Sequence, residues 1–210
     1  MLISIKRIII MAWDAQLKLD PNSPSFAAQC EELRRENAAL IERNLELEQY
    51  ACRDSLTPLY NRRHFMNVMD EEISRQKRRS TKAALLFVDV DGLKGVNDMH
   101  GHGGGDHLLV HIANLLMINL RQSDLLARLG GDEFGILLTK MTDEQIEQKI
   151  VRLSALIAQS ECNYDGAAIS ASISIGYSFV IDGDTAATVM ARADAAMYRH
   201  KRSSAKIHAA

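Results

Sequence analysis

The chain has 210 residues, of which 47% are hydrophobic and 25% charged, and its formal net charge is −2. This length suits one full-sized domain with an appendage, and the near-neutral charge argues against a general nucleic-acid binder. The three cysteines, Cys30, Cys52 and Cys162, are odd in number and widely spaced. Their spacing excludes a disulfide framework and a CxxC metal site, so we expect a reducing, cytoplasmic environment.

The first eleven residues are apolar but are interrupted by Lys6 and Arg7. They are too few to cross a bilayer, which needs about 20 residues, so we expect no membrane span. Three interpretations stay open: a signal or anchor, a start site placed upstream of a true start at Met11, or a genuine segment. In the last case residues 1–26 form a flexible region that can bind a regulatory protein.

A heptad pattern runs through residues 27–53. Leu33, Leu40 and Leu47 recur every seven residues, and asparagines precede two of these leucines by three residues. Leucine at d and asparagine at a favour a parallel coiled coil. The alternative is an amphipathic helix packed on its own domain, but the narrow apolar seam with charged flanks favours a stalk that pairs two chains.

Residues 54–210 have the pattern of a globular domain. The spacing of apolar residues predicts helices over residues 61–79, 106–120, 143–159 and 185–202. Apolar or alternating runs predict strands over residues 83–90, 125–129, 134–139 and 169–180. From residue 83 the order is β-α-β-β-α-β followed by one helix, which predicts an α+β domain with the ferredoxin-like split unit.

The segment Gly130-Gly131-Asp132-Glu133-Phe134 lies between two short apolar runs, so we expect it at the tip of a β-hairpin. Two adjacent carboxylates repel each other unless a cation or a proton neutralises them. Glycines beside them allow a phosphate-bearing ligand to approach the backbone. A glycine pair alone would indicate only a turn.

Asp89 and Asp91 end the first buried strand, which in this topology lies beside the hairpin. The carboxylates of the two segments are therefore expected to converge. Oxygen ligands without cysteine suit Mg²⁺, which also shares phosphate oxygens, so the implied substrate is a nucleotide or another polyphosphate. The alternative is a set of surface acids that cap strands.

Between the two acidic segments lie Lys94 and a Gly-rich stretch, residues 97–106. We expect this stretch to be a loop that opens a helix, where backbone N–H groups and the helix dipole favour an anion. It does not match GxxxxGK[ST], which excludes a Walker P-loop. Asp106 could accept hydrogen bonds from the N1–H and N2–H₂ groups of guanine, while Asn97 serves another edge of the base.

Together these residues resemble the GGDEF family of diguanylate cyclases, over about residues 53–201. The matching motifs, in chain order, are Asp54-Ser55-Leu56-Thr57, Asn61-Arg62, Asp89-Val90-Asp91, Lys94, Asn97-Asp98, Gly101-His102, Gly105-Asp106, Arg128, the pentapeptide, Ser174-Ile175-Gly176 and 192–198. The resemblance implies a fold like that of nucleotidyl cyclases and polymerase palms. It also implies the condensation of two GTP into cyclic di-GMP, with release of two pyrophosphates.

The resemblance implies roles for single residues. The metal, Mg²⁺ or Mn²⁺, would be bound by Asp89, the Val90 carbonyl, Asp132 and Glu133. Glu133 could instead help to deprotonate the attacking 3′-OH, and Asn97 and Asp106 would read guanine. The phosphates would be contacted by two lysines and by backbone groups, namely Lys94, Lys201, Gly92, Leu93, Gly130 and Gly131.

Two further expectations concern assembly and control. One site holds one GTP, so ring closure needs two sites face to face, and we expect a homodimer through residues 27–53. Arg121 and Asp124 match the family's RxxD inhibitory site, where the product binds back.

Ala205 stands where the family usually has an arginine, which predicts weaker GTP binding. The alternative function is a catalytically weak receptor or adapter that binds GTP or cyclic di-GMP and signals by protein contact.

Overall fold

The computed structural model describes residues 24–76 and 82–207 and divides the chain into two units, residues 1–49 and 50–210. The predictions for residues 1–23, including the alternative start at Met11, lie outside the described residues. The last three residues of the predicted helix 61–79 lie outside them as well. The limits of the three predicted segments, 1–26, 27–53 and 54–210, stay predictions.

The stalk region forms one continuous helix, α2 (Pro24–Cys52). Proline suits the first turn of a helix because no hydrogen bond is required of its nitrogen there. The side chains of Leu33, Leu40 and Leu47 are 63%, 66% and 51% exposed. A single chain thus leaves the apolar seam open, and pairing through this seam stays a prediction.

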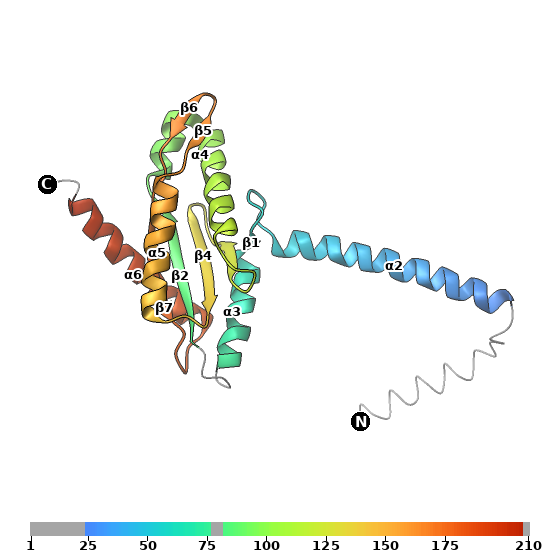
Figure 1. Ribbon diagram of the computed structural model, residues 1–210. Helices are drawn as coiled ribbons and strands as arrows, with labels where there is room; N and C mark the ends of the chain where they lie inside the picture. Colours follow the sequence, from blue (N-terminus) through green and yellow to red (C-terminus); the bar gives the residue numbers. More distant parts are fainter. Residues whose placement is uncertain (1–23, 77–81, 208–210) are drawn as a thin grey trace. The chain divides into compact units, whose positions relative to one another are not determined.

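The globular unit is built on a five-stranded sheet with the order β1-β3-β4-β2-β7 (Figure 1). The strands are β1 (Tyr60–Asn61), β2 (Ala83–Val90), β3 (Leu125–Arg128), β4 (Glu133–Thr139) and β7 (Ile173–Phe179). Strand β2 pairs antiparallel with both β4 and β7. The first strand of the split unit is therefore central and lies beside the hairpin, as the sequence predicts.

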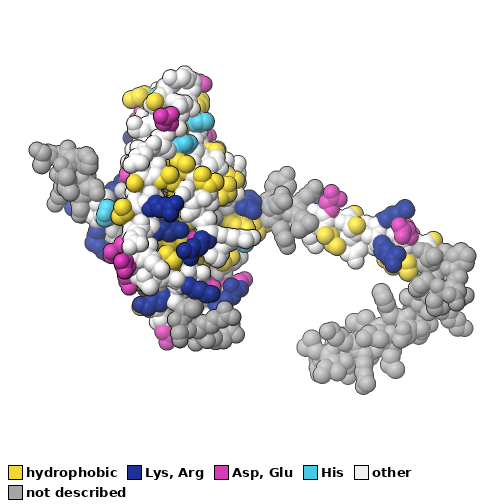
Figure 2. Space-filling view, viewed as in Figure 1, with side chains coloured by type: hydrophobic (Ala, Val, Ile, Leu, Met, Phe, Trp, Pro, Cys, Tyr) yellow, Lys and Arg dark blue, Asp and Glu magenta, His cyan; other side chains and the backbone are white. Residues whose placement is uncertain are grey.

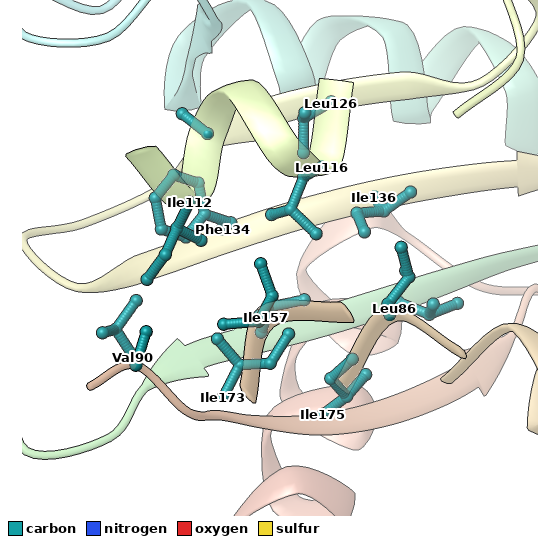
Figure 3. Packing of buried hydrophobic residues seen from close by; sticks show 14 of the residues in the cluster. Leu86, Val90, Ile112, Leu116, Leu126, Phe134, Ile136, Ile157, Ile173 and Ile175 are labelled. Carbon is teal, nitrogen blue, oxygen red and sulfur yellow. The ribbon is translucent and has the colours of Figure 1, made fainter. Parts of the chain in front are cut away.

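Helices cover both faces of the sheet (Figure 1). Two apolar clusters bring α4 (Leu93–Ile118) and α5 (Asp143–Ala158) onto one face, and α3 (Arg62–Gln76) and α6 (Ala186–Ile207) onto the other. Because side chains alternate along a strand, Leu86 of β2 enters the first cluster and Leu85 the second. Figure 3 shows the first cluster, where Phe134 of the hairpin packs near Ile112 of α4. The predicted α+β fold is confirmed.

The prediction of a loop over residues 97–106 is wrong, because α4 already begins at Leu93 and contains this stretch. The helix is interrupted at Gly101, whose φ of 73° and ψ of 172° are not helical. Glycine adopts such a conformation without the steric penalty of a Cβ atom. The helix therefore bends at Gly101 and continues, so residues 97 and 106 lie on two arms of one bent helix.

The structure adds a small hairpin, β5 (Cys162–Tyr164) and β6 (Ala167–Ile169), which the sequence analysis did not predict. Its two turn residues, Asp165 and Gly166, both have positive φ angles, of 49° and 80°. This is the backbone of a tight type I′ turn, for which Asp-Gly is a favoured sequence. The strand predicted over residues 169–180 accordingly begins only at Ile173.

No helix within residues 24–76 and 82–207 is long and apolar enough to cross a membrane. Cys30, Cys52 and Cys162 are free cysteines. The cytoplasmic environment expected from them stays a prediction.

Candidate active site

The end of β2 meets the tip of the β3–β4 hairpin, as the sequence predicts. Asp89 stands opposite Glu133 in the antiparallel register. The Val90 N–H donates to the Asp132 carbonyl over 2.9 Å, and the Leu129 N–H donates to the Glu133 carbonyl over 2.8 Å. Backbone pairing alone therefore holds the three acidic residues together at one edge of the sheet.

Burial and mutual repulsion act on these carboxylates. Burial, followed by the charge of Asp132, raises the pKa of Glu133, and the Arg62 guanidinium only partly offsets this. Burial also raises the pKa of Asp89, and the charges of Asp132 and Asp91 add to the effect. Ionised carboxylates in this place are costly without a cation, which is the electrostatic condition of a cation-binding site.

Lys201 of α6 places a positive charge next to these acids. Its ammonium group is hydrogen-bonded to Asp89 and lies 3.6 Å from a carboxylate oxygen of Asp91. Burial opposes the charge of Lys201, but the bond to Asp89 and the neighbouring acids raise the pKa of Lys201 overall. Asp91 also accepts hydrogen bonds from Ser172 and Ser174, over 3.0 and 2.8 Å, so it serves mainly to join β2 to β7.

The donor set at this edge fits Mg²⁺. No group of three or more His, Cys, Asp and Glu side chains within the described ranges is arranged to hold a metal ion. Mg²⁺ does not need such a cage, because it is usually bound by one or two carboxylates, waters and substrate phosphates. The neighbouring Asp89 and Asp132, with the Val90 carbonyl between the two segments, offer oxygen ligands of that kind.

A cleft of about 500 Å³ opens between the bent helix α4 and the hairpin tip. Its walls hold six residues to which the sequence assigned a role, namely Leu93, Lys94, Asn97, Asp106, Gly131 and Asp132. The Asn97 side chain lies directly against Gly105, where a Cβ atom would collide with its carbonyl oxygen. The bend in α4 thus places an amide and a carboxylate in one cleft, on the side where Asp132 stands.

Arg128, which matches the family motifs but received no role above, also lines this cleft. Its guanidinium donates to the Gly131 carbonyl over 2.7 Å and to the Asp54 carboxylate over 3.2 Å. Burial opposes ionisation of Asp54, but hydrogen bonds from Thr57 and the Arg128 charge lower its pKa overall. One arginine therefore ties the hairpin tip to the turn that follows α2.

The predicted inhibitory pair lies in a different place, beside a pocket of about 330 Å³. This pocket is lined by Arg121 and by Lys149 and Arg152 of α5. Asp124 accepts a hydrogen bond from the Arg121 N–H over 3.0 Å and lies 3.7 Å from the Lys149 ammonium. Figure 2 shows Lys and Arg side chains gathered on the face that carries α5, which makes this pocket suitable for an anionic ligand.

Sequence reasoning missed the two basic residues of α5, although a signal was present. Lys149 and Arg152 are three residues apart on a predicted helix, so they share one face. It also missed Tyr164, whose ring packs against His107 of α4 with centroids 5.5 Å apart. The Asp165–Gly166 dipeptide could have predicted the hairpin that carries Tyr164, but not what the hairpin contacts.

Comparisons with known proteins identify the family of this chain. A family model described as "Diguanylate cyclase, GGDEF domain" matches residues 51–206. The chain is 37% identical over 179 residues to a protein named diguanylate cyclase TpbB of Pseudomonas aeruginosa. That alignment covers 84% of this chain but only 41% of the relative, so the chain spans less than half of that protein's length.

Solved structures extend the likeness to α2. The coiled coil and GGDEF domain of DgcB from Caulobacter crescentus, in complex with c-di-GMP, matches with a TM-score of 0.79 and 25% identity, over 85% of this chain and 95% of that one. Diguanylate cyclase SiaD from Pseudomonas aeruginosa, in complex with its activator SiaC, matches with a TM-score of 0.71 and 31% identity, over 96% and 82%. With its fold, its hairpin pentapeptide and these matches in agreement, the chain belongs to the GGDEF diguanylate cyclase domain family.

Proposed function

We propose that the chain is a diguanylate cyclase, which joins two GTP molecules into cyclic di-GMP and releases two pyrophosphates. The observation that carries this proposal is the convergence of Asp89, Asp132 and Glu133 beside a cleft that also holds Asn97 and Asp106. The names of the relatives support the same activity. In each half-reaction a 3′-OH oxygen bonds to the α-phosphorus of the other GTP, and the bond from that phosphorus to pyrophosphate breaks.

Metal binding is assigned to Asp89, Asp132 and the Val90 carbonyl. Mg²⁺, or Mn²⁺ in its place, would neutralise charge that develops on the transferred phosphoryl group. Glu133 serves as a further ligand or as the base that takes the 3′-OH proton. Its raised pKa suits the second role, since a base is most effective when its pKa lies nearer the working pH.

Guanine is read by the two arms of α4, through the Asn97 amide and the Asp106 carboxylate. Lys94 and Lys201 hold phosphates, which requires Lys201 to exchange its bond with Asp89 for a bond to the nucleotide. The remaining phosphate contacts come from backbone groups at two turns, namely Gly92, Leu93, Gly130 and Gly131. The chain thereby positions the reactants, which is the protein's main contribution to phosphoryl transfer.

We assign the exposed seam of α2 to homodimerisation, because one site holds one GTP and ring closure needs two. Leu33, Leu40 and Leu47 are more than half exposed, and burying them against a second copy is favourable. The DgcB structure, which contains a coiled coil and a GGDEF domain, supports this assignment. The SiaD structure, with its bound activator, supports a regulatory protein as a further partner of the N-terminal region, residues 1–53.

Product inhibition is assigned to the pocket lined by Arg121, Lys149 and Arg152. The guanidinium groups of the two arginines can bind phosphates in a bidentate manner. The GGDEF structures solved with c-di-GMP support a product site in the family. The contacts of Asp124 with Arg121 and Lys149 change the role we expected for it. It accepts from the backbone N–H of Arg121 and lies beside the Lys149 ammonium, so it shapes the turn and orients Lys149, rather than offering a free carboxylate to guanine.

A catalytically weak receptor or adapter is the second candidate, favoured by Ala205 alone. Purified full-length protein with GTP and Mg²⁺, its nucleotides separated by chromatography, distinguishes the two. We expect cyclic di-GMP and pyrophosphate from the parent and from Glu161→Ala, an exposed acid that does not line the cleft, but neither product from Asp132→Ala. GTP binding without turnover by the parent would support the receptor instead.

A further inference from the structure

The β5–β6 hairpin packs against the bent helix α4 (Figure 1), the helix that carries both residues assigned to guanine. Cys162 and Ile169 anchor the hairpin in the main apolar core, where they are 1% and 4% exposed. Its tight turn leaves little freedom between these anchors. Tyr164, the last residue of β5, is thus held on a rigid support.

Tyr164 occupies space that only glycine leaves open on α4. A Cβ atom added to Gly103 would lie 2.5 Å from the Tyr164 hydroxyl oxygen, and one added to Gly104 would lie 3.5 Å from its ring. The same ring also packs against the ring of His107, with centroids 5.5 Å apart. The Tyr164 ring therefore packs on one turn of α4, immediately after the bend at Gly101.

Two further glycine contacts connect the packing of Tyr164 with the cleft. A Cβ atom at Gly104 would also lie 2.5 Å from His100, which belongs to the arm before the bend. Gly105 receives the side chain of Asn97 in the same way. The two arms of α4 therefore interlock through glycines, and Tyr164 covers the face where they do so.

We propose that Tyr164 is a positioning residue for guanine recognition. It holds the bend of α4 at the angle at which Asn97 and Asp106 can bind the same base. This inference rests on the proposed function, since it names how the same cleft selects its nucleotide. Tyr164 itself does not line the cleft and touches no reacting atom. Tyr164 acts indirectly. It supports the glycine contacts, and these contacts set the distance between the Asn97 amide and the Asp106 carboxylate.

A compensating pair of substitutions tests this geometry. In Gly103→Ala the new methyl group collides with the tyrosine hydroxyl, so the Tyr164 ring must move away from α4. In the double variant Gly103→Ala with Tyr164→Phe, the hydroxyl is gone, and the next atom, Cζ, lies at 3.5 Å, an ordinary van der Waals distance. Tyr164→Phe alone keeps the ring, and Asn163→Ala, an exposed neighbour on the same strand, is the matched control.

The readouts are kcat and KM for GTP and for inosine triphosphate, which lacks the exocyclic 2-amino group. We expect Gly103→Ala and Tyr164→Ala to raise KM for GTP about tenfold, the size of one weakened hydrogen-bond pair, with kcat within twofold of the parent. Their preference for GTP over inosine triphosphate should fall. The double variant should recover the parent KM and preference, and Asn163→Ala should keep both.

Unchanged KM and base preference in Gly103→Ala, or no recovery in the double variant, would overturn the inference while leaving the cyclase intact. If the parent forms no cyclic di-GMP, equilibrium binding of a non-hydrolysable GTP analogue to the same variants decides the question. A tenfold loss of binding that the double variant restores would then support the role of Tyr164 without catalysis. A parent that neither turns over nor binds the nucleotide would contradict both proposals.

Discussion

The carboxylates at the two ends of α6 are held in opposite ways. Before its first turn, Asp184 accepts two hydrogen bonds of 2.6 Å from the forked guanidinium of Arg192, and these bonds lower the pKa of Asp184 strongly. Near its last turns, beside Lys201, burial and neighbouring acids instead raise the pKa of Asp89 and Glu133. Asp184, which supports the fold, has its own arginine, whereas at the site burial and repulsion among the acids outweigh the charges of Lys201 and Arg62, which favours a further cation.

Glu133→Gln gives the largest effect expected from this contrast. Removing the carboxylate should lower cyclase turnover at least about 100-fold, because a base or ligand is lost. The free energy of unfolding in urea should stay equal or rise, since a crowded charge is removed. Lower stability with retained turnover would show that Glu133 belongs with Asp184, as a structural acid.

Deleting residues 1–49 separates loss of turnover from loss of fold, because both groups of acids remain. The cut leaves Ala51, whose carbonyl accepts hydrogen bonds from Asn61 and Arg63. At nanomolar enzyme we expect turnover per site to fall about tenfold or more, since the tether that raises effective concentration is gone. Turnover should recover at high enzyme concentration. Equal turnover of parent and deletion at nanomolar concentration would contradict the stalk's role.

Arg121→Ala tests a cation instead of an acid. It removes an exposed guanidinium group that is suited to bind an anion. We expect the concentration of cyclic di-GMP needed for half inhibition to rise about tenfold, through loss of a charge-assisted pair. KM for GTP should remain within twofold, since Arg121 lies in a different pocket. Gln122→Ala, an exposed neighbour in the same turn, is the control. Superimposable inhibition curves for Arg121→Ala and the parent would rule out this product site.

Asp184→Asn should affect the fold and not the chemistry. Breaking a fully buried ion pair costs about 3–5 kcal/mol, but Arg192 is 39% exposed, so we expect a loss of about 1–2 kcal/mol. Urea denaturation measures the loss, and KM and kcat should stay within twofold of the parent. Asp182→Asn, an exposed acid nearby, should change neither quantity. Lower turnover of Asp184→Asn at unchanged stability would contradict the distinction between Asp184, as a structural acid, and the acids of the site.

The two groups of acids should also respond to pH with opposite signs. The folded-state pKa of Asp184 is lowered, so its contribution to stability is present above its unfolded pKa, near 3.8, and is lost as the pH falls through the folded value. The folded-state pKa of Glu133 is raised. Its favourable contribution is therefore complete below its unfolded pKa, near 4.5, and is lost as the pH rises through the folded value.

Urea denaturation of three proteins between pH 3 and pH 8 checks these signs. At pH 7 the parent should be more stable than Asp184→Asn and no more stable than Glu133→Gln. Both differences should shrink towards low pH, that of Glu133→Gln first. A parent that is more stable than Glu133→Gln at pH 7, with the gap closing in acid, would reverse the assignment.

The sheet and the meeting of its acids could be predicted because they depend on local patterns and on a topology with few alternatives. An unbroken apolar run ending in Asp89, and a glycine pair before Asp132, are enough to place both residues at one edge. Their electrostatic state was not predictable, since it depends on Lys201 arriving from a helix 112 positions away. Distant side chains leave no periodic signal.

The bent helix was missed for a different reason. Four glycines between residues 101 and 105 predict a loop by propensity, but only Gly101 leaves the helical conformation. Packing keeps the other three helical, because Tyr164, His100 and Asn97 occupy the space that their missing side chains leave. Tertiary contacts therefore overrode propensity at the segment that holds the residues we assign to guanine binding.

A crystal structure of the full chain with a non-hydrolysable GTP analogue and Mg²⁺ tests the central claim most directly. We predict the ion on oxygens of Asp89 and Asp132, with the base between Asn97 and Asp106 and Lys201 moved from Asp89 to a phosphate. A nucleotide bound elsewhere, or an ion that contacts neither aspartate while Lys201 keeps its place, would contradict the account.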